Sequence, residues 1–238
     1  NERNQSKEIT PLRLIIRDIM KILFFSDIHG ISDNLKYIEE LENLNNFDKI
    51  VVLGDLYYTG PNYNMMQNSL KVFEFLMKYK DKMIILKGNC DSDVDIKATD
   101  IPISDLSLIN IDNLDIYLTH GHLYSYSKNR KFDRKGILIY GHEHIPYIIK
   151  EKDMIYICVG SISLPRNNSK PSYLIYDNHK FTLYDINKNK IDEIDVDNKI
   201  IITKSKKNKI SLKEKFEKYN SNNLSKDFVW DEPRGKEL

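Results

Sequence analysis

The feature that most constrains the fold is a set of short apolar runs, each of which ends in polar residues. Segments in which apolar residues recur every three or four positions separate the first three runs. This alternation is typical of βαβ units and predicts a parallel sheet. The runs and the polar residues after them are Ile22–Phe25 with Asp27 and His29, Ile50–Leu53 with Asp55, and Met83–Leu86 with Asn89.

The second half of the chain reads mostly as strands. Leu114–Leu118 ends in His120, and Ile137–Tyr140 ends in His142 and His144. Later runs alternate like the strands of a meander. We therefore expect an α/β fold with two packed sheets and helices outside. The carboxyl ends of its strands should meet at one edge, where ligands bind in open α/β sheets.

Histidines gather at these strand ends. Of six histidines in the chain, five lie there, and only His179 lies elsewhere. Imidazole and carboxylate ligands without a thiolate set suit Mn, Fe or Zn. Seven ligands are too many for one ion, but two ions that share a bridging carboxylate can use them, as in enzymes that cleave phosphate esters. The seven candidates are Asp27, His29, Asp55, Asn89, His120, His142 and His144.

Composition excludes several classes of protein. The net charge of +1 gives no general signal for binding a polyanion such as nucleic acid. Two cysteines are too few for a disulfide framework, and no apolar run approaches the length of a membrane-spanning helix. We expect a soluble, cytoplasmic protein without a membrane partner.

The pattern of motifs resembles the calcineurin-like metallophosphoesterases, and most closely their small bacterial and archaeal phosphodiesterases of the YfcE type. The resemblance covers about residues 20–194. Besides Asp27-x-His29 and Gly54-Asp55, it rests on Gly88-Asn89-Cys90-Asp91-Ser92, Thr119-His120-Gly121-His122, Gly141-His142-Glu143-His144-Ile145-Pro146 and Gly160-Ser161-Ile162-Ser163-Leu164-Pro165-Arg166.

The resemblance implies a four-layer αββα sandwich of two mixed β-sheets flanked by helices. It also implies a phosphodiesterase that hydrolyses small phosphate diesters by attack of a metal-bridging hydroxide. Two divalent transition-metal ions are expected, Mn first, with Ni, Fe, Co and Zn as alternatives. One ion would be held by Asp27, His29 and His144, the other by Asn89, His120 and His142, and Asp55 would bridge them.

Three further residues are candidates for the reaction. Larger relatives have a histidine after the metal-binding asparagine, where this chain has Cys90, a poor general acid. His122 is the nearest alternative proton donor in the sequence. Without a strong acid, substrates with good leaving groups are favoured. Arg166 offers a planar fork for a phosphate group, although a surface role is equally expected.

Two other functions remain open at this stage. One is a non-catalytic scaffold of the same fold, as in the retromer subunit of this superfamily, which departs from the ligand set that this chain keeps. The other is a nuclease or nucleotide phosphatase, which the absence of a basic patch within residues 20–194 disfavours. The sequence also leaves open whether the chain forms a homo-oligomer.

The two ends of the chain lie outside the family resemblance and are considered separately. Residues 1–19 form an N-terminal extension without an assigned role, and residues 195–238 form a basic, partly disordered appendage. The tail is similar to the C-terminal region of MazE-type antitoxins, through Lys199–Thr203, Ser211–Tyr219 and Trp230–Leu238. This resemblance implies a MazF-like toxin as a partner; a linker with chance similarity is the alternative.

Overall fold

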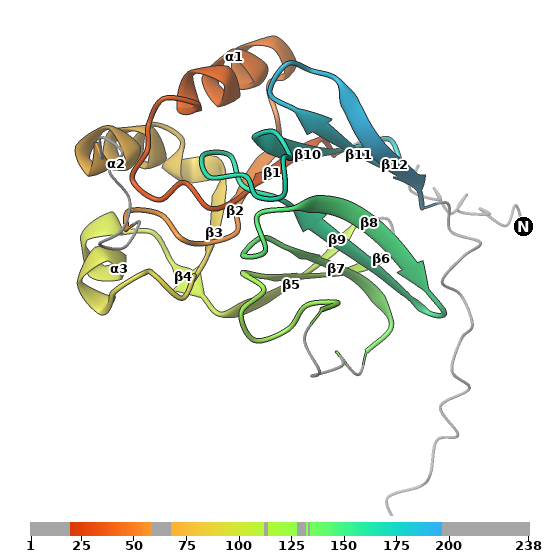
Figure 1. The fold of residues 1–238 in the computed structure, drawn as a ribbon. Coiled ribbons are helices and arrows are strands. Elements are labelled where there is room, and N and C mark those ends of the chain that lie inside the picture. Colours follow the sequence, from red (N-terminus) through yellow and green to blue (C-terminus); the bar gives the residue numbers. More distant parts are fainter. Residues whose placement is uncertain (1–19, 59–67, 112–113, 128–131, 133, 197–238) are drawn as a thin grey trace, which may run out of the picture. The chain divides into compact units, whose positions relative to one another are not determined.

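The computed structural model describes residues 20–58, 68–111, 114–127, 132 and 134–196. Two mixed β-sheets lie face to face in this part of the chain (Figure 1). The larger sheet has the strand order β12-β11-β10-β1-β2-β3-β4 and the smaller one has the order β5-β6-β7-β9-β8. The predicted fold class, two mixed sheets with flanking helices, is confirmed.

The elements have the following bounds. The larger sheet contains β1 (Ile22–Phe25), β2 (Lys49–Val52), β3 (Met83–Leu86), β4 (Ile103–Ser104), β10 (Ser172–Asp177), β11 (Lys180–Asp185) and β12 (Lys190–Asp195). The smaller sheet contains β5 (Leu106–Ile111), β6 (Leu114–Thr119), β7 (Gly136–Tyr140), β8 (Pro146–Glu151) and β9 (Met154–Val159). The helices are α1 (Leu35–Asn45), α2 (Ser69–Lys78) and α3 (Asp93–Thr99), with a 3₁₀ turn at Lys80–Lys82.

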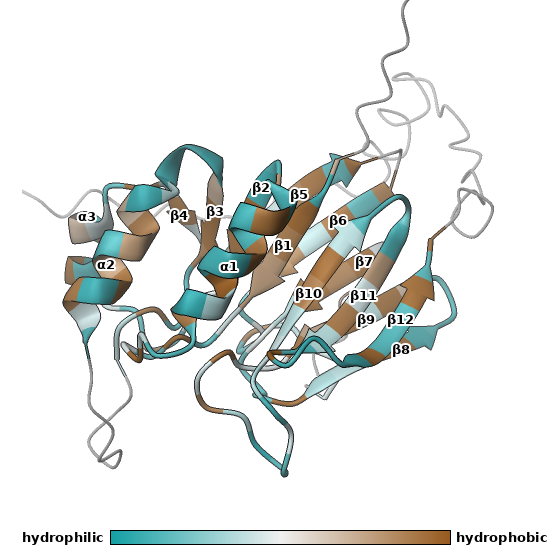
Figure 2. Ribbon diagram, turned by 90° about the horizontal axis from the view of Figure 1, so that it is seen from above, coloured by the Kyte–Doolittle hydropathy of each residue, from teal (hydrophilic) through white to brown (hydrophobic). Residues whose placement is uncertain are grey.

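Strand β1 is buried on both faces, which explains why the first apolar run contains no polar residue. Side chains alternate across a strand, so a strand covered on both faces needs apolar residues throughout. Ile22 and Phe24 face the smaller sheet, whereas Leu23 and Phe25 pack under helices α1 and α2. In Figure 2 strands β1 and β3 are largely brown, whereas helices α1 and α2 alternate between brown and teal.

The parallel pairs β1–β2, β2–β3, β6–β7 and β7–β9 direct their carboxyl ends to one edge of the molecule. The antiparallel strands β10, β11 and β12 extend the larger sheet on the other side of β1. The loops that carry the predicted ligands therefore leave both sheets at the same end.

The two sheets differ in what covers their outer faces. Helices α1 and α2 cover the larger sheet. On the smaller sheet, buried Tyr117, Leu138 and Tyr140 form an outer cluster onto which Phe132 packs. Among the described residues, the segment between β6 and β7 that supplies this cover is a loop and contains no helix.

Sequence periodicity did not predict α3, β8 or β12. Helix α3 has only seven residues and one buried side chain, so it lacks an apolar stripe. A capping box between Ser92 and Asp95 starts it instead. Strand β12 is exposed along most of its length, although Val196 directly after it is buried in the core between the sheets.

Several sequence-based predictions concern residues outside the described ranges. These are the N-terminal extension, the tail from residue 197 onward and the toxin partner that the tail suggests. None of the described helices is both long and apolar enough to cross a lipid bilayer.

The difference in burial between two leucines leads to a stability prediction. Leu174 of β10 is completely buried between the sheets, whereas Leu108 of β5 is 55% exposed. We expect Leu174→Ala to lower the free energy of unfolding by about 2–5 kcal/mol, because it leaves a cavity. Leu108→Ala, the matched control, should change it by less than about 1 kcal/mol. Equilibrium unfolding in urea measures both, and equal losses would contradict the assignment of this core.

Candidate metal centre

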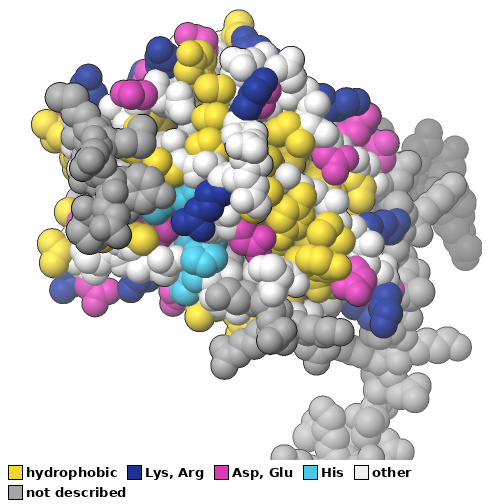
Figure 3. Space-filling view, in the orientation of Figure 1, with side chains coloured by type: hydrophobic (Ala, Val, Ile, Leu, Met, Phe, Trp, Pro, Cys, Tyr) yellow, Lys and Arg dark blue, Asp and Glu magenta, His cyan; other side chains and the backbone are white. Residues whose placement is uncertain are grey.

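All seven predicted ligands come together at the carboxyl ends of five strands. Asp27 and His29 follow β1, Asp55 follows β2, and Asn89 follows β3 in the larger sheet. His120 follows β6, while His142 and His144 follow β7 in the smaller sheet. The site therefore lies where the ends of the two sheets meet, and histidine side chains reach the surface there beside a basic side chain (Figure 3).

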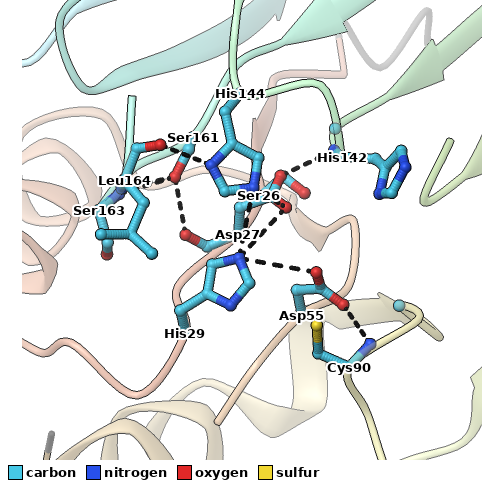
Figure 4. A network of polar contacts seen from close by, with 12 residues as sticks. Ser26, Asp27, His29, Asp55, Cys90, His142, His144, Ser161, Ser163 and Leu164 are labelled. Carbon is cyan, nitrogen blue, oxygen red and sulfur yellow. Dashed lines mark hydrogen bonds and ion pairs between the residues drawn. The ribbon is translucent and has the colours of Figure 1, made fainter. Parts of the chain in front are cut away.

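The first group of ligand atoms contains Asp27, His29 and His144 (Figure 4). The Oδ1 atom of Asp27 lies 3.1 Å from Nε2 of His144 and 3.7 Å from Nε2 of His29. The two Nε2 atoms are 3.4 Å apart. Three potential donors of an electron pair thus converge on one small volume.

The second group centres on His120. Its Nε2 atom lies 3.1 Å from Oδ1 of Asn89, 3.2 Å from Nδ1 of His142 and 3.3 Å from Oδ2 of Asp55. The same Oδ2 atom of Asp55 lies 3.6 Å from Nε2 of His29 in the first group. One carboxylate oxygen therefore stands between the two groups.

Backbone carbonyl groups fix the orientation of three of the imidazole rings. In each ring Nδ1 donates to a carbonyl oxygen, which leaves Nε2 of the neutral ring as an acceptor aimed into the site. Such outer hydrogen bonds are usual for metal-binding histidines. The three bonds are His29 to Tyr58 at 2.6 Å, His120 to Leu53 at 2.7 Å and His144 to Leu164 at 2.5 Å.

The environment of Oδ1 of Asp27 shows whether the site suits a cation. It is completely buried and has no hydrogen-bond partner among the described residues. Its neighbour at 3.1 Å is Nε2 of His144, which also presents an electron pair when the ring is neutral. Two acceptors at this separation need a positive charge between them, and a divalent ion meets that need.

The pKa values of the histidines and carboxylates in the site also favour the binding of positive charge. Burial alone would lower the pKa of His120, but the hydrogen bond to Asp55 and the charge of Asp27 raise it to about 9. Burial and the neighbouring His120 lower the pKa of His142 to about 4. Burial opposes ionisation of Asp27, yet the neighbouring imidazoles of His144, His29 and His120 hold its pKa well below the ordinary range. The carboxylates thus attract positive charge into the site.

Five of the seven candidate ligands have left-handed backbone conformations. The φ angles are 57° for Asp27, 53° for His29, 54° for Asp55, 64° for His142 and 61° for His144. Residues with a Cβ atom rarely adopt such angles, which cost about 1–2 kcal/mol each. The tight turns after β1, β2 and β7 are therefore held in place by the rest of the fold.

Asp91 and Ser161 support these turns, although sequence reasoning gave them no role. The buried carboxylate of Asp91 accepts from the backbone N–H groups of Gly88, Asp55 and Leu56 at 2.7–2.9 Å. Ser161 donates to the carbonyl oxygen of Asp27 at 2.9 Å. Both residues lie in the motifs on which the family resemblance rests. Their place in these motifs could have identified them from the sequence.

The remaining candidates lie around the two groups. Cys90 is half-buried beside Asp55, and burial together with that carboxylate raises the pKa of its thiol to about 12. The ring of His122 lies 5.6 Å from that of His120 and 6.2 Å from that of His142, between ring centres. Arg166 has an exposed side chain, and its backbone N–H donates to the carbonyl oxygen of His144 at 3.0 Å.

Comparison with known proteins identifies the family. Residues 20–180 match the model of the calcineurin-like phosphoesterase superfamily domain. The chain belongs to the calcineurin-like phosphoesterase superfamily. The prediction of a metal-dependent phosphoesterase is therefore confirmed at the level of the family.

Relatives within this superfamily cover the same part of the chain. Phosphodiesterase YfcE of Escherichia coli K12 is 30% identical over 172 residues, which are 71% of this chain and 94% of the relative. A probable metallophosphoesterase of Mycoplasma genitalium is also 30% identical, over 71% of this chain and 93% of its own length. A solved structure of the Escherichia coli phosphoesterase YfcE superposes with a TM-score of 0.69 at 29% identity, covering 74% of this chain and all of that one.

The left-handed turn at His142 makes a prediction that separates backbone strain from side-chain contacts. His142→Ala and His142→Gly both remove the imidazole, but only the alanine keeps a Cβ atom at φ 64°. We expect the glycine variant to be more stable than the alanine variant by about 1 kcal/mol, the reverse of the usual order. Unfolding in urea with EDTA present measures this difference. A more stable alanine variant would contradict strain at this turn.

Proposed function

We propose that this chain is a dinuclear-metal phosphodiesterase that hydrolyses small phosphate diesters. The observation that carries the proposal is the position of Asp55, whose Oδ2 atom stands between the two groups of ligand atoms. A carboxylate shared in this way is what a pair of ions needs.

Each side chain then has a definite role. Asp27, His29 and His144 would hold one ion, and Asn89, His120 and His142 the other. When bound, two divalent ions would lower the pKa of a shared water to about 7 and neutralise charge on the phosphoryl group. Mn is the first candidate, with Ni, Fe, Co and Zn as alternatives, because imidazole and carboxylate ligands suit all of them.

Three residues outside the ligand set would act on the substrate. His122 lies beside the second group and is proposed as the proton donor to the leaving group. The protonated thiol of Cys90 is proposed to line the site without acting as a nucleophile. Arg166, anchored to the loop of His144 by its backbone, is proposed to meet a phosphate oxygen.

The relatives support a diester substrate, since YfcE is described as a phosphodiesterase. The convergence of all seven ligands supports an enzyme over a scaffold. The described residues offer no observation that favours a nuclease or a nucleotide phosphatase.

Turnover tests the proposal directly. We expect the purified chain to hydrolyse bis(p-nitrophenyl) phosphate when Mn²⁺ is added, and Asp55→Ala to lower kcat/KM more than about 100-fold. Loss of an outer hydrogen bond to a metal ligand already costs 10–100-fold, and Asp55 is proposed to contact both ions.

Asp153→Ala is the matched control, because Asp153 is an exposed carboxylate that pairs with Lys135 at 2.7 Å away from the ligand groups. No turnover with Mn²⁺, Ni²⁺, Co²⁺ or Mg²⁺ would favour the scaffold. Full activity of Asp55→Ala would refute the bridging role.

Metal binding should also stabilise the fold. An ion at 100 times its dissociation constant that binds only the folded state adds about 2.7 kcal/mol per site. For a chain of this size we expect Mn²⁺ to raise the Tm by at least about 5 °C over protein in EDTA. Thermal unfolding with metal analysis measures this effect. Asp55→Ala should show less than half of the shift, and an equal shift would count against its role.

A further inference from the structure

A carboxylate outside the ligand set connects two loops of the site. Glu143 lies between His142 and His144 in the loop after β7. It faces residues 121–127 after β6, here called the His122 loop. Hydrogen bonds from this loop reach both oxygens of the carboxylate by two routes.

The longer route runs through two phenols, of which Tyr140 is buried and Tyr147 is partly buried. The hydroxyl of Tyr147 donates to Oε2 of Glu143 at 2.7 Å. Because a phenol has only one proton to donate, the 2.7 Å bond between Tyr140 and Tyr147 must have Tyr140 as its donor. The oxygen of Tyr140 in turn accepts from the backbone N–H of Tyr126 at 3.0 Å. The chain of bonds therefore has one direction, from the His122 loop to Glu143.

The shorter route is direct. The hydroxyl of Ser127 donates to Oε1 of Glu143 at 2.5 Å. The two routes leave the loop at adjacent residues, Tyr126 and Ser127, and end on the two oxygens of one side chain. Hydrogen bonds to a carboxylate are shorter and stronger than bonds between neutral groups.

The surroundings make this network rigid. Tyr140 is completely buried, and Tyr147 lies over it in an edge-on contact with 6.3 Å between ring centres. Hydrogen bonds in such a low-dielectric interior reinforce one another. In the His122 loop, Tyr126 is 44% exposed and Leu123 is 39% exposed, although the ring of Tyr126 also contacts that of Tyr156 with 5.4 Å between ring centres.

We propose that Glu143 is a positioning residue that clamps the His122 loop against the second group of ligands. The clamp acts on a loop whose first residues lie beside His120 and His142, so it sets where the His122 ring stands relative to a bound substrate. The kinetic part of this inference rests on the proposed phosphodiesterase function, whereas the structural part does not.

Hydrogen exchange in the full chain tests the structural part. Glu143→Gln replaces one acceptor oxygen by a donor, and Tyr147→Phe removes the longer route while keeping the ring. We expect both to increase exchange of the backbone amides of residues 121–127 about tenfold, with exchange in β7 and β9 unchanged. The controls are Glu151→Gln, an exposed glutamate of β8, and Tyr184→Phe, a tyrosine of the larger sheet.

Exchange that stays unchanged in both clamp variants would overturn the inference. So would an equal increase in β7 and β9, because the effect would then be one of global stability.

Kinetics with Mn²⁺ test the consequence for the reaction. We expect Glu143→Gln and Tyr147→Phe to keep the metal content of the unsubstituted chain. For bis(p-nitrophenyl) phosphate, kcat should fall about three- to tenfold, with KM changed less than twofold. A loss of rate that follows a loss of metal would overturn the positioning role, as would unchanged kcat. If the unsubstituted chain shows no turnover with any metal, the proposed function fails while the exchange data still decide the clamp.

Discussion

The structure depends on two carboxylates that are buried next to each other. Asp27 and Asp55 are almost inaccessible to solvent, and each carries a charge that would cost several kcal/mol to bury without compensation. Imidazole rings from three strand ends surround them, and the uncompensated Oδ1 atom of Asp27 leaves a place for further positive charge. Nearly every other feature of the site serves to hold these charges close together.

The backbone geometry follows from this requirement. Short turns after β1, β2 and β7 bring side chains from two sheets to one point, and they do so with left-handed residues that have a Cβ atom. Asp91 compensates part of the strain by accepting three backbone N–H groups from the turns after β2 and β3. The strained turns thus lower the stability of the fold but hold the candidate ligands in a fixed arrangement, as is common at functional sites.

The two sheets contribute differently. The larger sheet is anchored by helices on its outer face, whereas the outer face of the smaller sheet is covered, within the described ranges, by a loop. That loop begins at the candidate ligand His120 and is connected through Tyr140 and Tyr147 to Glu143. The polar network of this face therefore connects its covering loop with the candidate metal centre.

The sequence by itself determined the strand ends, the types of ligand and the family. Uninterrupted apolar runs are strands buried on both faces, and polar residues directly after them must lie at one edge. It could not predict α3, whose seven residues depend on a capping box, or β12, which is held by pairing with β11 and has no apolar pattern. The family resemblance already implied that Asp55 lies between the two groups, but only the tertiary structure decided that Nε2 of three rings faces inward and that Glu143 binds a distant loop. These facts depend on distances between residues far apart in the chain, and local periodicity carries no information about such distances.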